Sequence, residues 1–317
     1  MAFVFLRAAV RRMSLLLSLI LCAAAMVWAQ EPTPETGTTL FPGGAFVSYG
    51  SVFTTRQAPS MQTPTASLRP TFAHEGRFLF AWGFRRDFDL TILVPVATHS
   101  FHFAGLPAAP TLGGTGIGDA TVTVKYRFLR RDSDRGTTQA SVTFGPKLPT
   151  GQTGLRDGSG VRLPAGLQPG SGSTDFLFGL NGTYTGLFHI ERLVADGAFT
   201  YTKRTEGTQQ IQLGDTAEAR FWLSYRPYQT HSVDREWWLG PALTWTHGLN
   251  DAQAGISVPG SAGDTLRLGA ATFFSPHPGI HLWFSSDFPV VQSHGTNFSR
   301  ERRRFSVGIT KQFRLAR

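Results

Sequence analysis

Charged side chains recur two residues apart in this sequence, as in Lys125 and Arg127 or in Glu218 and Arg220. Residues two apart in a β-strand point to the same face, so each pair would project from one wall. Charges on the wall of a pore select ions, and arginine and lysine favour anions. The candidate pore-lining residues are Lys125, Arg127, Lys147, Arg204, Glu218, Arg220, Arg226 and Arg267.

The same face carries further charges when each strand is read at two-residue spacing. They are Arg304 and the acidic residues Asp89, Asp175, Asp196 and Asp287. Two interpretations of the charged face stay open. The basic residues could lower the barrier to anions. Alternatively, opposite charges could form salt bridges that brace the wall, as Glu218 and Arg220 could on one strand.

The segments that must position these residues alternate apolar and polar side chains. Near the C-terminus, for example, Phe305, Val307 and Ile309 alternate with Ser306 and Gly308. This period indicates strands with one apolar face. Twelve strands are expected, at about residues 45–55, 77–84, 88–101, 119–129, 138–148, 175–184, 192–203, 216–226, 236–247, 265–274, 279–288 and 304–313.

The repeated pattern predicts an all-β fold, a transmembrane antiparallel β-barrel of about 12 strands with long outer loops and short periplasmic turns. Closure of such a barrel leaves no strand edge in lipid. A soluble β-sandwich or lipocalin-like barrel would bury its apolar face in a core and turn its polar face outward. Here the second face is small or polar, which suits a hydrated lumen. The longest loop is expected at residues 149–173.

The N-terminus has the features of a secretory signal, with Arg7, Arg11 and Arg12 before an apolar stretch. A lipoprotein signal ending at Cys22 is the alternative, which the bulky Leu21 disfavours. The expected organisation is a signal peptide at 1–29, a periplasmic N-terminal segment at 30–44, the β-barrel at 45–313 and a C-terminal tail at 314–317. The expected location is the outer membrane of a Gram-negative-type bacterium, with the barrel surrounded by outer-membrane lipid.

Several kinds of chemistry are disfavoured. Cys22 is the only cysteine and would leave with the signal, so disulfides and cysteine-type zinc sites are excluded from the mature chain. The nine histidines are scattered, and neither a metal site nor a cofactor is expected. The net charge of +9 is spread along the chain, so no nucleic-acid partner is expected. The GTGIGD motif at 114–119 has no strand–helix context and is interpreted as an outer loop.

An enzymatic function is a further alternative, because some outer-membrane barrels are hydrolases. Ser293, His294 and Asn297 lie close together in the sequence, near the last outer loop. Their spacing matches no hydrolase signature, and serine and asparagine are common in loops. We therefore expect no catalytic residues and no enzymatic activity.

Three segments resemble one family of outer-membrane transporters. They are GTGIGDATVTVKYRFL at 114–129, FGPKLPTG at 144–151 and LPAGLQPGSGSTDFLFGL at 163–180. Together they are similar to the family labelled as the MetA-pathway of phenol degradation. The resemblance implies a barrel that passes small, often hydrophobic or aromatic, compounds across the outer membrane. It supplies no catalytic residues.

The expected function is therefore an outer-membrane channel or facilitator for small organic solutes. A closed structural or adhesive barrel is the alternative, and an outer-membrane hydrolase is a third. Twelve strands enclose more room than the eight whose side chains just fill a barrel, which favours a conduit. The barrel-assembly machinery is the expected partner of the last strand, which ends at Phe313 although four residues follow it. Whether the 149–173 loop or the N-terminal segment narrows the pore stays open.

Overall fold

The computed structural model describes residues 36–57, 70–102, 111–134, 136–229, 236–295 and 300–315. The predicted signal peptide lies outside these ranges, as do residues 30–35 of the expected N-terminal segment and the last two residues. Strands dominate the described chain, and its helices are three single turns, η1 (Ala165–Leu167), η2 (Leu187–His189) and η3 (Thr208–Gln210). No helix in these ranges is long and apolar enough to cross a membrane.

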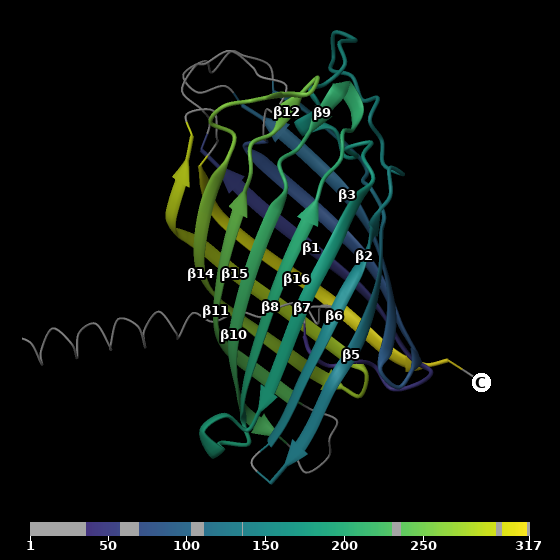
Figure 1. Ribbon diagram of the computed structural model, residues 1–317, viewed down its shortest axis with the longest axis vertical. Helices are drawn as coiled ribbons and strands as arrows, with labels where there is room; N and C mark the ends of the chain where they lie inside the picture. The colour runs from purple at the N-terminus through teal and green to yellow at the C-terminus, as the bar shows by residue number, and fades with distance from the viewer. Residues whose placement is uncertain are drawn as a thin grey trace, which may run out of the picture.

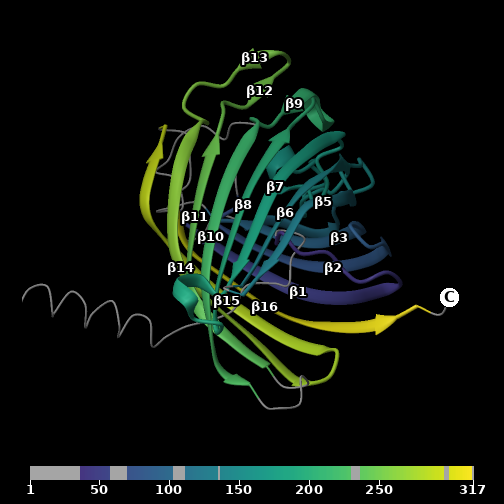
Figure 2. The ribbon, with the colours of Figure 1, turned by 60° about the horizontal axis from the view of Figure 1, so that its bottom comes forward.

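Twelve antiparallel strands of the described chain close into a barrel (Figures 1 and 2). They are β1 (Gly44–Arg56), β2 (Phe72–Arg85), β3 (Phe88–Phe101), β5 (Thr121–Ser133), β6 (Gly136–Lys147), β7 (Asp175–Thr185), β8 (Leu193–Lys203), β10 (Thr216–Gln229), β11 (Glu236–Gly248), β14 (Gly263–His277), β15 (Ile280–His294) and β16 (Glu301–Arg314). The first strand pairs with both β2 and β16, which closes the ring. Closure satisfies the backbone groups of every strand without water, as lipid requires.

Four shorter strands lie toward the outer end, which is the end opposite the start of β1 and the end of β16. One of them, β4 (Leu112–Ile117), pairs with the half of β3 nearer the outer end, whereas β5 pairs with the half nearer the periplasmic end. The others, β9 (Ile211–Gln212), β12 (Ala252–Gln253) and β13 (Ile256–Ser257), form a small separate sheet beyond the barrel strands (Figure 2).

The two faces of the barrel strands differ as the alternation predicts. On β5, Tyr126 and Phe128 are exposed on the outer surface, whereas Lys125 and Arg127 are buried on the inner side. On β16, Ile309 is exposed and Thr310 is fully buried. An apolar outer surface suits contact with acyl chains, and a polar inner surface suits a lumen.

The predicted strands are all present, but several extend further at the outer end. The strand expected from residue 77 begins at Phe72, the one expected to end at 288 continues to His294, and the one expected from 304 begins at Glu301. The predicted tail at 314–317 also changes, because Arg314 belongs to β16 and the Leu315 N–H donates to the Gly43 carbonyl. The alternation of apolar and polar residues weakens beyond the bilayer, because neither face of a strand contacts lipid there. The sequence pattern therefore did not reveal these strand ends.

The interpretation of the GTGIGD motif as a loop is wrong for its first part. Its residues up to Ile117 belong to β4 and pair with β3. Two of its glycines lie directly beneath side chains of the 148–174 loop, which would have to shift if a Cβ were added. A Cβ at Gly114 would lie 2.7 Å from Leu155, and one at Gly116 would clash with the side chain of Gln152.

Candidate functional site

The N-terminal strap, residues 36–43, lies inside the barrel near its periplasmic end. Lys125 donates hydrogen bonds from its Nζ to the carbonyl oxygens of Thr36 and Thr38, at 3.2 and 2.9 Å. The Leu40 N–H donates to the carboxylate of Asp89 at 3.0 Å. The described part of the segment expected at 30–44 thus contacts the inner wall of the barrel. Inward polar side chains satisfy the strap's backbone, which lets it remain in the lumen.

An aromatic cavity of about 530 Å³ lies between the strap and the opposite wall. Its apolar lining includes Phe46, Trp222, Trp238 and Phe273, from β1, β10, β11 and β14. The polar lining includes Asp89, Lys125, Asp196 and Glu236. Such a cavity can hold an apolar ring while a few polar groups orient it. The Trp222 indole N–H is buried and makes no hydrogen bond within the described chain.

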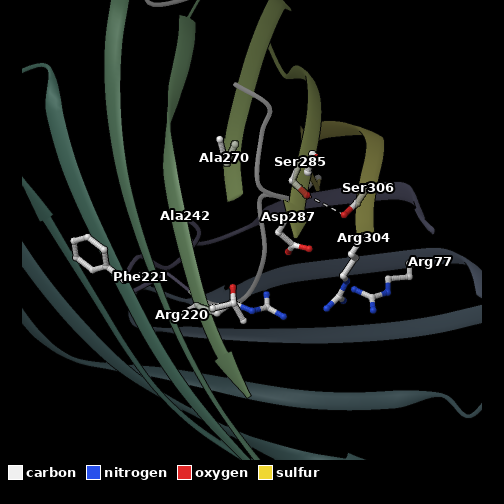
Figure 3. A pocket seen from close by; sticks show the side chains of 12 residues that line it. Arg77, Arg220, Phe221, Ala242, Ala270, Ser285, Asp287, Arg304 and Ser306 are labelled. Atoms are coloured by element: carbon white, nitrogen blue, oxygen red, sulfur yellow. Dashed lines mark hydrogen bonds between the residues drawn. The ribbon is translucent and has the colours of Figure 1, made fainter. Parts of the chain in front are cut away.

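An arginine cluster occupies the middle of the lumen (Figure 3). Arg77 of β2, Arg220 of β10 and Arg304 of β16 line one small cavity together with Asp287. Figure 3 shows their guanidinium groups directed toward one another. Two of them are oriented by carboxylates on their own strands. Arg77 pairs with Glu75 at 2.8 Å, and Arg220 pairs with Glu218 at 2.6 Å.

A further ion pair lies beside this cluster. Arg267 on β14 pairs with Glu301 on β16 through Nε at 2.8 Å and Nη2 at 3.1 Å, and both side chains are buried. Arg267 also donates to the Thr246 hydroxyl at 2.9 Å. Two parallel bonds fix the orientation of a guanidinium. This pair therefore bridges strands that are separated by β15.

The 148–174 loop folds against the inner side of β3 and β4 at the outer end. Leu163 and Leu167 of this loop are buried against Phe101. A cavity of about 280 Å³ between the loops and the arginine cluster is lined by Gly166 and Leu213 among others. The loops thus roof part of the lumen, as the strap narrows its other end.

Asp215 anchors the outer loops before β10. Its carboxylate accepts hydrogen bonds from the Tyr201 hydroxyl at 2.7 Å, from Lys203 Nζ at 2.8 Å and from the Arg204 N–H at 2.8 Å. Burial raises the pKa of Asp215, but these hydrogen bonds outweigh it and hold the pKa below its ordinary value. The loop ends are therefore tied together at neutral pH.

The eight candidate pore-lining residues are distributed over the length of the barrel. Glu218, Arg220 and Arg267 lie in the central lumen. Near the periplasmic end, Arg127 pairs with Asp87 at 2.6 Å, Arg226 pairs with Glu236 at 3.4 Å, and Lys125 holds the strap. At the outer end, Lys147 pairs with Asp119 at 3.2 Å and with Asp175 at 2.7 Å, and Arg204 lies 3.9 Å from Asp175. They do not form one site, and each makes a polar contact with a side chain or a backbone carbonyl of the described chain.

Sequence reasoning missed part of the central cluster. Arg77 shares its face with Leu79 and Ala81, which are buried in the lumen, so two-residue spacing could have found it. Glu75 and Glu301 were placed outside their strands because the strand ends were set too late. The inward tryptophans were missed because only charged residues were considered as candidates for the lumen. Trp222 nevertheless follows Glu218 and Arg220 at the same spacing.

The described chain offers no metal-binding group of three or more His, Cys, Asp or Glu side chains. The candidate hydrolase residues are not brought into one described arrangement. Ser293 and His294 lie in β15, and Asn297 lies outside the described residues. The absence of enzymatic activity stays a prediction.

A closed barrel with an apolar outer surface and a charged lumen defines an outer-membrane β-barrel protein. The sequence model of the family described as "Putative MetA-pathway of phenol degradation" matches residues 70–292, so the chain belongs to this family. The predicted family resemblance and outer-membrane location are both confirmed. A comparison with curated proteins finds no match.

The chain is also similar to solved structures. The crystal structure of an outer membrane channel from Pseudomonas putida F1 has a TM-score of 0.63 at 15% identity, over 90% of this chain and 100% of that one. The β-domain of the Bordetella autotransporter BrkA has a TM-score of 0.47 at 13% identity, over 85% and 100%. The KdgM porin has a TM-score of 0.43 at 13% identity, over 84% and 99%. The first of these supports the twelve-stranded barrel.

Proposed function

We propose that the protein is an outer-membrane channel or facilitator for small organic solutes, including hydrophobic or aromatic ones. The aromatic cavity is the observation that carries the proposal. Its volume of about 530 Å³ falls within the range of small-molecule sites. It lies in the lumen, where a solute crossing the barrel must pass. The association of the family with phenol degradation and the structural similarity to an outer membrane channel of P. putida support the same function.

Both ends of the lumen are narrowed, so the expected conductance is small. The strap lines the periplasmic end, and the 148–174 loop roofs part of the outer end. A narrow path delays large hydrated ions but admits a flat organic solute that can contact the cavity wall. The arginine cluster adds a weak preference for anions.

The experiment is electrophysiology with the full-length processed protein in planar bilayers, combined with solute efflux from proteoliposomes. A channel gives discrete conductance steps in KCl and releases an entrapped charged aromatic solute, such as benzenesulfonate, faster than liposomes without protein. The control is the same protein inserted after boiling, which should give neither signal. Absence of both signals from correctly folded protein would overturn the proposal.

A closed structural barrel is the second candidate. The strap and the roof loop favour it, because each fills lumen space with hydrogen-bonded or packed chain. The two candidates differ in the effect of loosening the strap. A facilitator gains conductance when the strap is released, whereas a packed structural barrel loses stability and gains none.

A further inference from the structure

Arg304 differs from the other arginines of the cluster in its contacts. Its guanidinium makes no hydrogen bond and no ion pair to any residue that the structure describes. Four carboxylates, those of Glu75, Glu218, Asp287 and Glu301, lie near enough to interact with it electrostatically. Arg304 therefore lies in a charged environment but makes no hydrogen bond or ion pair with another described residue.

Asp287 lies directly opposite Arg304 in the β15–β16 register, so it is the carboxylate best placed in the sheet to form an ion pair with Arg304. No ion pair joins them, and Asp287 Oδ1 is buried without a hydrogen bond in the described chain. Figure 3 shows Asp287 at the side of the cavity, while the Arg304 guanidinium extends toward Arg77. The N–H groups of Arg304 therefore remain directed to the lumen.

Most of the other residues that line this cavity have small side chains. Serine hydroxyls come from β15 and β16, and Ser285 and Ser306 lie 2.9 Å apart across the two strands. Alanine side chains line the facing wall, at Ala242, Ala270 and Ala271. Small residues leave room for a ligand between the guanidinium groups. The site therefore offers arginine donors and serine hydroxyls around a cavity of about 60 Å³, which Phe221 also lines.

The arginine cluster and the aromatic cavity are lined by neighbouring residues of two strands. Trp222 follows Arg220 by two residues on β10, and Phe273 follows Ala271 by two residues on β14. Two residues of a strand span about 7 Å and keep the same face. Trp222 and Phe273 line the aromatic cavity, whereas Arg220 and Ala271 line the arginine cluster. A small molecule can therefore reach both.

We propose that the lumen binds a small aromatic carboxylic acid. Arg304, with Arg77 and Arg220, takes the carboxylate, and the ring points toward Trp222 and Phe273. Arginine binds a carboxylate through two parallel N–H donors, which gives both energy and orientation. Glu75 and Glu218 hold the Arg77 and Arg220 side chains in place beside the cavity. This inference rests on the proposed function, because it names the class of solute.

The test is isothermal titration calorimetry of the full-length protein in detergent, with benzoate as the probe. Acetate carries the charge without the ring, and benzyl alcohol carries the ring without the charge. Benzoate should bind at least tenfold more tightly than either. Equal affinities for benzoate and acetate, or for benzoate and benzyl alcohol, would overturn the proposal.

Variants locate the site. Arg304→Gln and, independently, Arg77→Gln should each weaken benzoate binding at least tenfold, while Arg303→Gln should not change it. Arg303 is exposed and adjacent in sequence, so it is the matched control. Asp287→Asn should strengthen binding, because it removes a repulsive charge beside the carboxylate. Unchanged affinity in both Arg304→Gln and Arg77→Gln would overturn the assignment, provided that each variant shows the heat-dependent electrophoretic shift of a folded barrel.

Conductance in KCl separates this inference from the proposed function. Each preparation is also inserted into planar bilayers. A protein that conducts but shows no benzoate binding contradicts the aromatic-acid site and leaves the channel function standing. A protein that binds benzoate with the expected variant pattern but does not conduct supports the site and contradicts the channel.

Discussion

The ammonium group of Lys125 donates a hydrogen bond to the carbonyl oxygen of Thr38 at 2.9 Å, which fastens the N-terminal strap to the inner wall of β5. The same ammonium group donates to the Thr36 carbonyl at 3.2 Å. A single side chain on the barrel therefore holds two points of the strap. Lys125 thus helps to set the position of the strap, together with Asp89 and Thr183.

Lys125→Met should loosen the strap and increase conductance. The substitution keeps the length of the side chain but removes the donors to the strap. Single-channel recordings in KCl should show larger or more variable steps than the parent protein. Lys311→Met is the control, because Lys311 is exposed on β16. Identical recordings for both variants would mean that the strap does not limit the pore.

Adjacent residues on β6 should respond differently to a charge. Val142 is exposed on the outer surface, and Val142→Arg should destabilise the barrel by about 2–4 kcal/mol if this position lies near the bilayer midplane. Thr143→Arg points to the lumen and should cost less. The free energy of unfolding in lipid vesicles, measured with guanidinium chloride, distinguishes them. Equal losses would place the two side chains in similar surroundings.

Phe313 should matter for assembly. It pairs with Ala45, where the last strand closes on the first, and its ring is on the outer surface. Phe313→Asp should reduce the amount of folded protein in the outer membrane, because it places a charge at the lipid interface. Deleting residues 316–317 should have little effect. Immunoblots of outer-membrane fractions measure both, and comparable amounts would contradict the assigned role.

The Arg267–Glu301 pair should contribute to stability. Arg267→Met leaves the buried Glu301 carboxylate without its main partner, so the free energy of unfolding should fall by about 1–3 kcal/mol. Glu301→Gln should recover part of this loss when combined with Arg267→Met, because the buried charge is removed. A double-mutant cycle in denaturant measures the coupling. Additive losses would show that the two side chains act independently.

The central arginines should set ion preference. Arg220→Glu combined with Arg304→Glu changes the charge of the lumen by four units in the negative direction. The reversal potential under a KCl gradient should then shift toward that of cations. Conductance with an unchanged reversal potential would mean that these side chains only brace the wall. Arg303→Glu, on the exposed side of β16, is the control.

The alternation of the sequence was sufficient to predict the class of fold, the twelve barrel strands and the face of most inward residues. Lipid on one side and a lumen on the other impose a period of two, which can be read without any tertiary information. Lys125 and Tyr126 were therefore assigned to opposite faces, and they lie on opposite faces in the structure. The outer ends of strands were less predictable because lipid no longer imposes the period there.

Spacing gives the face of a residue but not its height in the barrel. Strand tilt and register set that height, and they follow from the closure of the whole sheet. Only the tertiary structure therefore showed that Arg77, Arg220 and Arg304 meet although they come from distant strands. The position of the strap was equally unpredictable from the sequence, because residues 36–43 show no repeating pattern. Hydrogen bonds to Lys125 and Asp89 hold these residues in the lumen. The sequence by itself determined the strands that form the barrel wall, whereas the closure of the barrel determined which side chains meet in the lumen.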